Sequence, residues 1–240
     1  MRLVRRYPNS TLLVFLLIFF VLQPIVTQFP ILLAALIIDG SFILIFVAAL
    51  NAESERISWR DPDLWLVIAS TVLRLTVTLR VGDIDAGPYR NLIIWTEIFS
   101  GIVLFRLCGT LLRNIRKSPR VRFDTIACAS AVYILIALAF TNLYIAAWVQ
   151  ETGDGAFNGV EAWEGGQFED STLRKWGQSF AYFSVVTQTT LGYGDITPRT
   201  SITRGLVMLQ TVVGQLYLAI LLALLVAVWL AQRQLDDQVE

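Results

Sequence analysis

The sequence TTLGYGD, residues 189–195, decides how the chain is expected to fold. In this stretch Gly192 and Gly194 alternate with bulkier residues, and glycine adopts positive φ at little cost. A backbone of this kind can turn its own carbonyls toward a dehydrated cation. A Gly-Tyr-Gly tripeptide is common in ordinary loops, so the interpretation depends on the flanking segments.

The two segments that flank this stretch are both apolar, but they differ in length. Residues 176–188 are too few to cross a bilayer, whereas residues 202–230 are long enough. Irregular backbone at membrane depth must be buried in protein or line a cavity. We therefore expect a re-entrant helix, a loop and a spanning helix, in that order.

With these flanks, residues 190–195 resemble the selectivity filter of the tetrameric potassium channels, whose usual form has Val in place of Leu191. The resemblance implies a homotetramer around a common axis. It also implies that potassium is the permeating ion and that no cofactor is needed. The filter residues are then Thr190, Leu191, Gly192, Tyr193 and Gly194, of which the first four supply the carbonyls that bind K⁺.

Residues around the filter are expected to support it. Tyr182 and Phe183 are predicted to form an aromatic cuff with the filter tyrosine, the alternative being that they serve only as core. Val186 stands where some family members have a carboxylate that bonds near Asp195, so that bond is not expected. Gln188 is larger than the residues common at its position and could hydrogen-bond behind the filter. The predicted supporting residues are Tyr182, Phe183, Val186, Gln188, Thr189 and Asp195.

The composition is that of an integral membrane protein. Of the 240 residues, 55% are hydrophobic and 16% charged, and the mean hydropathy is +0.62. A net charge of zero gives no indication of a nucleic-acid partner. The sequence has no histidine, nucleophile–base constellation or phosphate loop, so we do not expect an enzyme. Cys108 and Cys128 lie in apolar runs, which favours packed free thiols.

Apolar runs predict an all-α membrane protein with six transmembrane helices, plus the re-entrant pore helix and the filter loop. The first run is not interpreted as a signal peptide, because it lacks a cleavage site and continues into a second run. Residues 1–117 are expected to form a four-helix module similar to a voltage sensor, and residues 118–240 the pore domain. The runs cover residues 11–26, 31–50, 64–79, 91–112, 123–149 and 202–230.

Basic residues predict the orientation of the chain. They predominate on the side that is cytoplasmic if both termini are cytoplasmic. The densest basic stretch, residues 112–122, could bind anionic lipid head groups. Residues 213–218, VGQLYL, resemble small prokaryotic channels, which implies a bacterial inner membrane.

Four ionisable residues fall inside apolar runs, where an unpaired charge is costly. Asp39 with Arg74, and Glu97 with Arg106, are the predicted pairs. A role in fixing the register of the helices is favoured over voltage sensing. Moving one charge across 100 mV is worth only ~2.3 kcal/mol, so a single arginine in the fourth run predicts weak or no voltage dependence.

The last apolar run is predicted to contain the gate. Gly214 could serve as a hinge or, alternatively, allow close helix packing. Helical spacing places Leu218, Leu222 and either Leu225 or Val226 on its face, where an apolar constriction could gate by dewetting.

The segment 150–175 is rich in acidic residues and glycine. It could raise the cation concentration at the outer mouth or be only a solvated loop. Neither interpretation predicts an effect on selectivity.

The leading hypothesis is a potassium-selective channel that conducts K⁺ passively across a cell membrane. One alternative is a weakly selective cation channel in which Leu191 or Gln188 loosens the filter. Another is a non-conducting regulatory membrane subunit.

Overall fold

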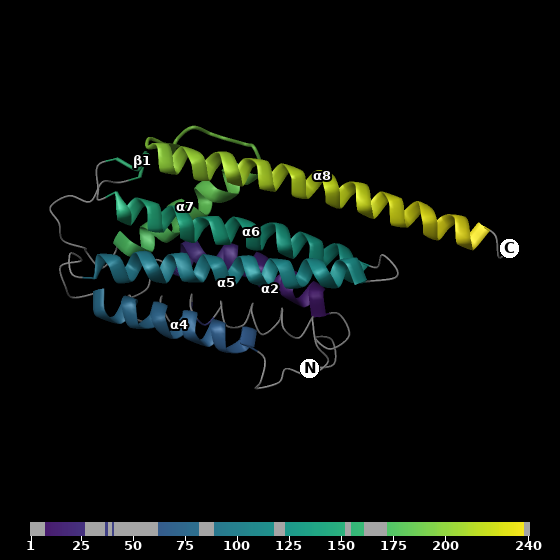
Figure 1. The fold of residues 1–240 in the computed structure, drawn as a ribbon, viewed down its shortest axis with the longest axis horizontal. Helices are drawn as coiled ribbons and strands as arrows, with labels where there is room; N and C mark the ends of the chain where they lie inside the picture. The colour runs from purple at the N-terminus through teal and green to yellow at the C-terminus, as the bar shows by residue number, and fades with distance from the viewer. Residues whose placement is uncertain are drawn as a thin grey trace.

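The computed structural model describes residues 8–26, 37, 40, 62–81, 89–117, 123–151, 155–160 and 172–237. Within these ranges the chain is almost entirely helical, as expected (Figure 1). The elements in chain order are α2 (Pro8–Val26), α4 (Pro62–Val81), α5 (Arg90–Lys117), α6 (Phe123–Gln150), β1 (Phe157–Asn158), α7 (Thr172–Gln188), β2 (Thr197–Pro198) and α8 (Ser201–Asp237).

Helix α6 is the centre of the molecule and packs against α2, α5, α7 and α8. Figure 1 shows the helices α4, α5, α6 and α8 following one another across the molecule. The contact between α5 and α6 is close, because a Cβ built on Gly101 would lie 3.3 Å from the carbonyl oxygen of Ala139. Small residues such as Ala129, Ala131 and Ala139 are fully buried on α6 and allow neighbouring helices to approach.

Helix α2 is fixed to the start of α6 by polar contacts. Asp124 accepts a hydrogen bond from Asn9 Nδ2 at 2.6 Å, and further bonds from the backbone amide and hydroxyl of Ser10 at 2.9 Å. Leu12 and Leu16 of α2 are buried in the same hydrophobic core as residues of α5, α6 and α7. The described helices of the two predicted modules therefore share one core within a single chain.

Three helices in the described part of the chain are long and apolar enough to cross a membrane, namely Arg90–Arg113, Phe123–Gln150 and Ser201–Leu224. Helix α2 contains a shorter apolar stretch, Asn9–Gln23, and α4 forms a helix over the predicted third run. Most of the predicted second run, residues 31–50, lies outside the described residues, as does Asp39. The protein is thus an integral membrane protein, and the number of six spans stays a prediction.

The structure corrects one predicted ion pair. Arg74 on α4 contacts Glu97 on α5 at 3.1 Å and donates to Asn142 Oδ1 on α6 at 3.3 Å. Arg106, further along α5, instead binds Asp63 at the start of α4. The predicted pairing of Glu97 with Arg106 is therefore wrong, because the middle of α4 faces the first half of α5. The predicted partner of Arg74, Asp39, is outside the described residues.

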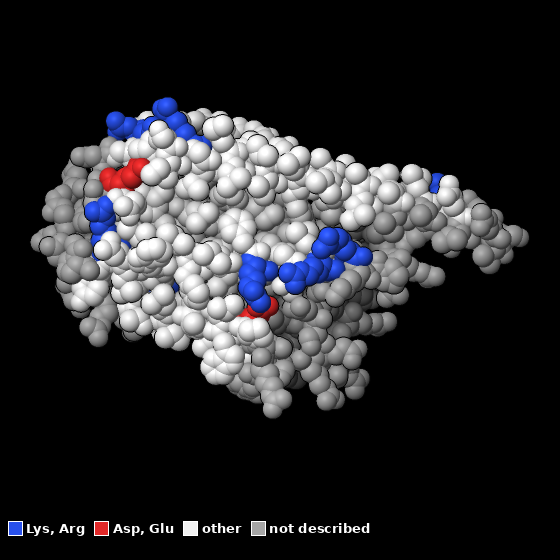
Figure 2. Space-filling view, viewed as in Figure 1, with Lys and Arg blue, Asp and Glu red and all other residues white. Residues whose placement is uncertain are grey.

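Lys and Arg side chains lie in several places on one face, and two of these groups are prominent (Figure 2). One lies over the C-terminal part of α5, where Arg113 and Arg116 are exposed. The other lies near the start of α8, where Arg199 and Arg204 are exposed. Cys108 and Cys128 are buried free cysteines, as predicted.

Candidate functional site

The candidate site is the predicted filter, residues 189–195, which we call the filter loop. It follows directly from the last turn of α7. The amide of Thr190 donates to the carbonyl of Thr187 at 3.1 Å. The amides of Leu191 and Gly192 both donate to the carbonyl of Val186, at 3.0 and 3.4 Å. The end of α7 thus uses its free carbonyls to satisfy the amides at the start of the loop.

Backbone conformation alternates in hand along the loop. Thr190, Gly192 and Gly194 have φ values of 59°, 54° and 82°, whereas φ is negative at Leu191 and Tyr193. Among the described residues, Thr190 is the only non-glycine with positive φ. Positive φ was expected at the glycines but not at a β-branched residue, for which the left-handed region costs about 1–2 kcal/mol. Strain of this kind persists where the surrounding structure enforces it, and it gathers at functional sites.

The carbonyl side of the loop is open within one chain. In the part of the chain that the structure describes, no backbone hydrogen bond ends on the carbonyls of residues 190–193. Leu191 and Tyr193 are 56% and 65% exposed, and a Cβ built on Gly192 or Gly194 would meet nothing within 4 Å. Alternating hand turns successive carbonyls to one side of a ribbon, so these acceptors are available to a ligand.

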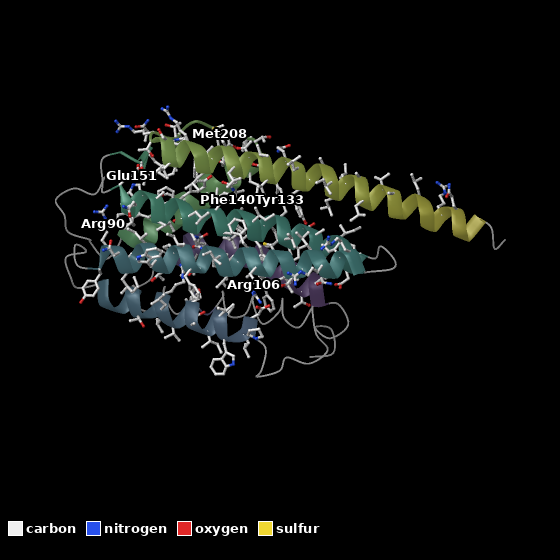
Figure 3. The ribbon with its side chains drawn as sticks, viewed as in Figure 1. Arg90, Arg106, Tyr133, Phe140, Glu151 and Met208 are labelled. Carbon is white, nitrogen blue, oxygen red and sulfur yellow. The ribbon has the colours of Figure 1, made fainter. Side chains whose placement is uncertain are left out.

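A buried amide network lies behind the loop and joins α6, α7 and α8. Gln210 on α8 donates to Ser184 Oγ at 2.7 Å and to Gln188 Oε1 at 3.1 Å, and it accepts from the hydroxyl of Tyr144 at 2.5 Å. Gln188 Nε2 donates to the carbonyl of Tyr133 at 2.6 Å, and the hydroxyl of Tyr133 donates back to the carbonyl of Gln188 at 3.0 Å. Tyr133 is labelled on α6 in Figure 3. Gln188 therefore makes the hydrogen bonds behind the loop that its size led us to expect.

Gln188 also explains the contact made by Gly214. A Cβ built on Gly214 would lie 2.8 Å from Gln188 Cγ, so the glycine allows α8 to approach the end of α7. Leu218, Leu222 and Val226, predicted on the same face as Gly214, are exposed in the single chain. Each step of four residues rotates the position by about 40° around a helix of 3.6 residues per turn. The predicted gate residues therefore begin at Gly214, which is buried against α7, and move round to the exposed face of α8.

The predicted aromatic cuff is divided between two places. The rings of Tyr182 and Tyr193 stack, with centroids 6.4 Å apart and planes at 6°. Phe183 is buried instead against Tyr144 and Phe157, at 5.1 and 5.3 Å. Because Tyr182 and Phe183 are adjacent on α7, they face different sides of the helix. Of these two aromatic residues, Tyr182 is the one that stacks on Tyr193 in the described part of the chain.

At the end of the loop away from α7, Asp195 accepts a hydrogen bond from the side chain of Tyr182. This bond is the main reason why the pKa of Asp195 lies below its usual value. Val186 has no polar side chain to take part, as its sequence position implied, and contributes its carbonyl to the loop amides instead.

Residues 159–230 match a family model described as an ion channel. The match supports an ion channel. It covers α7, the filter loop and most of α8, and it favours a non-enzymatic membrane protein. No curated protein and no solved structure matches the chain.

Sequence reasoning missed several residues that hold the site. Gln210 could have been found, because an amide in an apolar spanning run needs a partner. Tyr133 and Tyr144 gave no such signal, since tyrosine is common in membrane helices. Thr189 was predicted as a support, and it donates through its hydroxyl only to the end of its own helix, at 2.8 Å to Val185.

Proposed function

We propose that this chain is the subunit of a potassium-selective channel, in which four copies surround one axis and conduct K⁺ passively. The alternating backbone hand from Thr190 to Gly194 carries this proposal. It turns the carbonyls of residues 190–193 to one side, while α7 holds the amides of residues 190–192. No backbone hydrogen bond in the described chain ends on these carbonyls. A row of such oxygens can replace the hydration shell of potassium.

One loop provides only one wall of such a site. The exposed side chains of Leu191 and Tyr193, and the open space around Gly192 and Gly194, leave room for neighbouring copies and for the ion. Rotational symmetry would repeat each carbonyl of residues 190–193 as a ring. The Thr190 hydroxyl would add an inner ring.

The last turn of α7 adds an electrostatic contribution. The C-terminal end of a helix carries a partial negative charge, which favours a cation near Gln188 and Thr189. The carboxylate of Asp195, whose pKa lies below its usual value, adds negative charge at the outer end of the loop. Both ends of the proposed pathway would therefore attract K⁺.

The helices before the pore are proposed to have a structural role. Arg74 is paired with Glu97 between α4 and α5, and Arg106 with Asp63. Paired charges at fixed positions set the register of helices. We therefore propose weak or no voltage dependence.

The proposed location is a bacterial inner membrane with both termini cytoplasmic. In that orientation the exposed Arg113 and Arg116 at the end of α5 lie at the inner surface. Anionic lipid head groups are the proposed partners of the basic stretch 112–122.

The test is the reversal potential of purified protein in planar bilayers, with K⁺ on one side and Na⁺ on the other. We expect a value near the potassium equilibrium potential. A Gly192→Ala variant should lose selectivity, because alanine rarely adopts positive φ. Gly177→Ala on α7 is the matched control, since a Cβ there would meet nothing within 4 Å.

A reversal potential near zero would identify a weakly selective cation channel. Absence of current from correctly assembled tetramers would favour a non-conducting subunit.

A further inference from the structure

The filter loop is contacted by α7 and also by residues 155–160, which we name the outer segment. They belong to the acidic stretch 150–175, for which no effect on selectivity was expected. Strand β1 in this segment pairs antiparallel with β2, which follows the loop directly. Phe157 lies opposite Pro198, and Asn158 opposite Thr197.

The carbonyl of Ala156 extends this contact. It accepts a hydrogen bond from the amide of Arg199 at 2.9 Å and another from the hydroxyl of Thr203 at 3.0 Å. Thr203 is fully buried at the start of α8. The outer segment is thus joined to both β2 and α8 by buried or backbone hydrogen bonds.

The buried side chain of Phe157 holds the outer segment against the helices. It is buried, with ring centroids 5.0 Å from Phe180, 5.3 Å from Phe183 and 5.7 Å from Tyr144. These partners belong to α7 and α6. The segment is therefore held by the helices that also carry the filter loop.

Gly159 brings the outer segment into contact with the loop itself. Its φ is +80°, and a Cβ built on it would lie 1.8 Å from the carbonyl oxygen of Asp195 and 2.9 Å from the carbonyl carbon. These atoms are backbone and cannot move aside as a flexible side chain could. Any larger residue at 159 must displace Asp195 or the outer segment.

We propose that Gly159 is a positioning residue for the outer end of the filter, and that the outer segment fixes selectivity by holding Asp195 in place. This inference rests on the proposed channel function. Asp195 follows Gly194, whose positive φ belongs to the alternating pattern. A shift of Asp195 therefore moves the outermost carbonyls of the loop.

The test compares Gly159→Ala with Gly155→Ala in the same segment. A Cβ on Gly155 would meet nothing within 4 Å, and its φ is not in the left-handed region. For Gly159→Ala we expect about a tenfold fall in the K⁺ to Na⁺ permeability ratio, since a misplacement of about 1 Å in a preorganised site can cost up to about a hundredfold. Gly155→Ala should keep the wild-type ratio.

Thr203→Val is a second variant. It preserves volume and removes the hydroxyl that donates to the carbonyl of Ala156, a hydroxyl that also bonds the amide, hydroxyl and carbonyl of Thr200 at the start of α8. Its backbone amide can still bond the Thr200 hydroxyl at the start of α8. We expect about a threefold fall in the permeability ratio, because the hydrogen bond that joins Ala156 to α8 is lost. If Gly159→Ala fails to fold, this variant decides the question.

Hydrogen exchange of the amides in residues 189–200 is a readout that does not need conduction. Exchange should be faster in Gly159→Ala and Thr203→Val than in wild type and Gly155→Ala. Wild-type exchange and permeability in a folded Gly159→Ala tetramer would overturn the proposal. A wild-type protein that conducts without selectivity would refute the proposed function, and the exchange data would still test the contact.

Discussion

Helices α6 and α8 are both long and apolar, but they differ in how much of each is covered. In an apolar stretch of 18 residues within each spanning part, 72% of the residues are buried in α6, against 11% in α8. Figure 1 shows α8 extending beyond the other helices. Met208, which is 69% exposed, is labelled on α8 in Figure 3.

The difference shows which helix surfaces are covered by other parts of the same chain and which are not. Helix α6 is covered by four helices of its own chain, so its apolar residues specify the fold. Helix α8 is covered at only a few positions, among them Gln210 and Gly214, which lie against α7. Its remaining apolar face requires lipid or other copies of the chain, which the proposed tetramer would supply.

The largest expected effect comes from overfilling the covered helix. Ala139→Leu adds volume where α6 touches Gly101 of α5, and overpacking of a core typically costs about 1–3 kcal/mol of the free energy of unfolding. Ala219→Leu on the exposed face of α8 should leave the stability of the single chain unchanged. Denaturant titration of both variants in detergent measures the difference. Equal losses would mean that α8 is as constrained as α6.

The amide network tests a region where α8 is fully buried, around Gln210. Gln210→Leu leaves the hydroxyl of Tyr144 and Oε1 of Gln188 without their partner, at a cost of about 1–3 kcal/mol. Thr211→Val is the control, because the Thr211 hydroxyl bonds only to Val207 of its own helix.

Adding Tyr144→Phe to Gln210→Leu should recover part of the lost stability, and a double-mutant cycle measures the coupling. Additive losses would contradict a shared network.

The smallest effect is expected at Gly214. Gly214→Ala should lower stability by about 1 kcal/mol, because its Cβ would overlap Gln188 and outweigh the gain in helix propensity. Gly205→Ala, where a Cβ would meet nothing within 4 Å, should raise stability by about 0.5–1 kcal/mol. Thermal unfolding measures both. If Gly214→Ala reduced channel opening at unchanged stability, Gly214 would be a hinge rather than a packing contact.

The residues of the filter loop show how far sequence reasoning reached. Positive φ at Gly192 and Gly194 followed from their missing Cβ, and Gln188 was expected to bond behind the loop. Positive φ at Thr190 could not be predicted, because its β-branched side chain disfavours that conformation and only the surrounding contacts impose it. For Phe183 the structure favours the second of the two interpretations, a core position. Its neighbours along the helix did not reveal which side of α7 faces the core.

The local chemistry of the sequence was enough to determine the class of protein and the conformation permitted to the central stretch, residues 189–195. Apolar runs require a membrane, and alternating glycines permit a loop of alternating hand. Tertiary structure decided the partners, because these depend on which helix faces meet. Arg74, rather than Arg106, is the partner of Glu97. Gln210 bonds Gln188, and Gly159 lies against Asp195. Each of these contacts joins residues far apart in the chain, whose proximity no local pattern encodes.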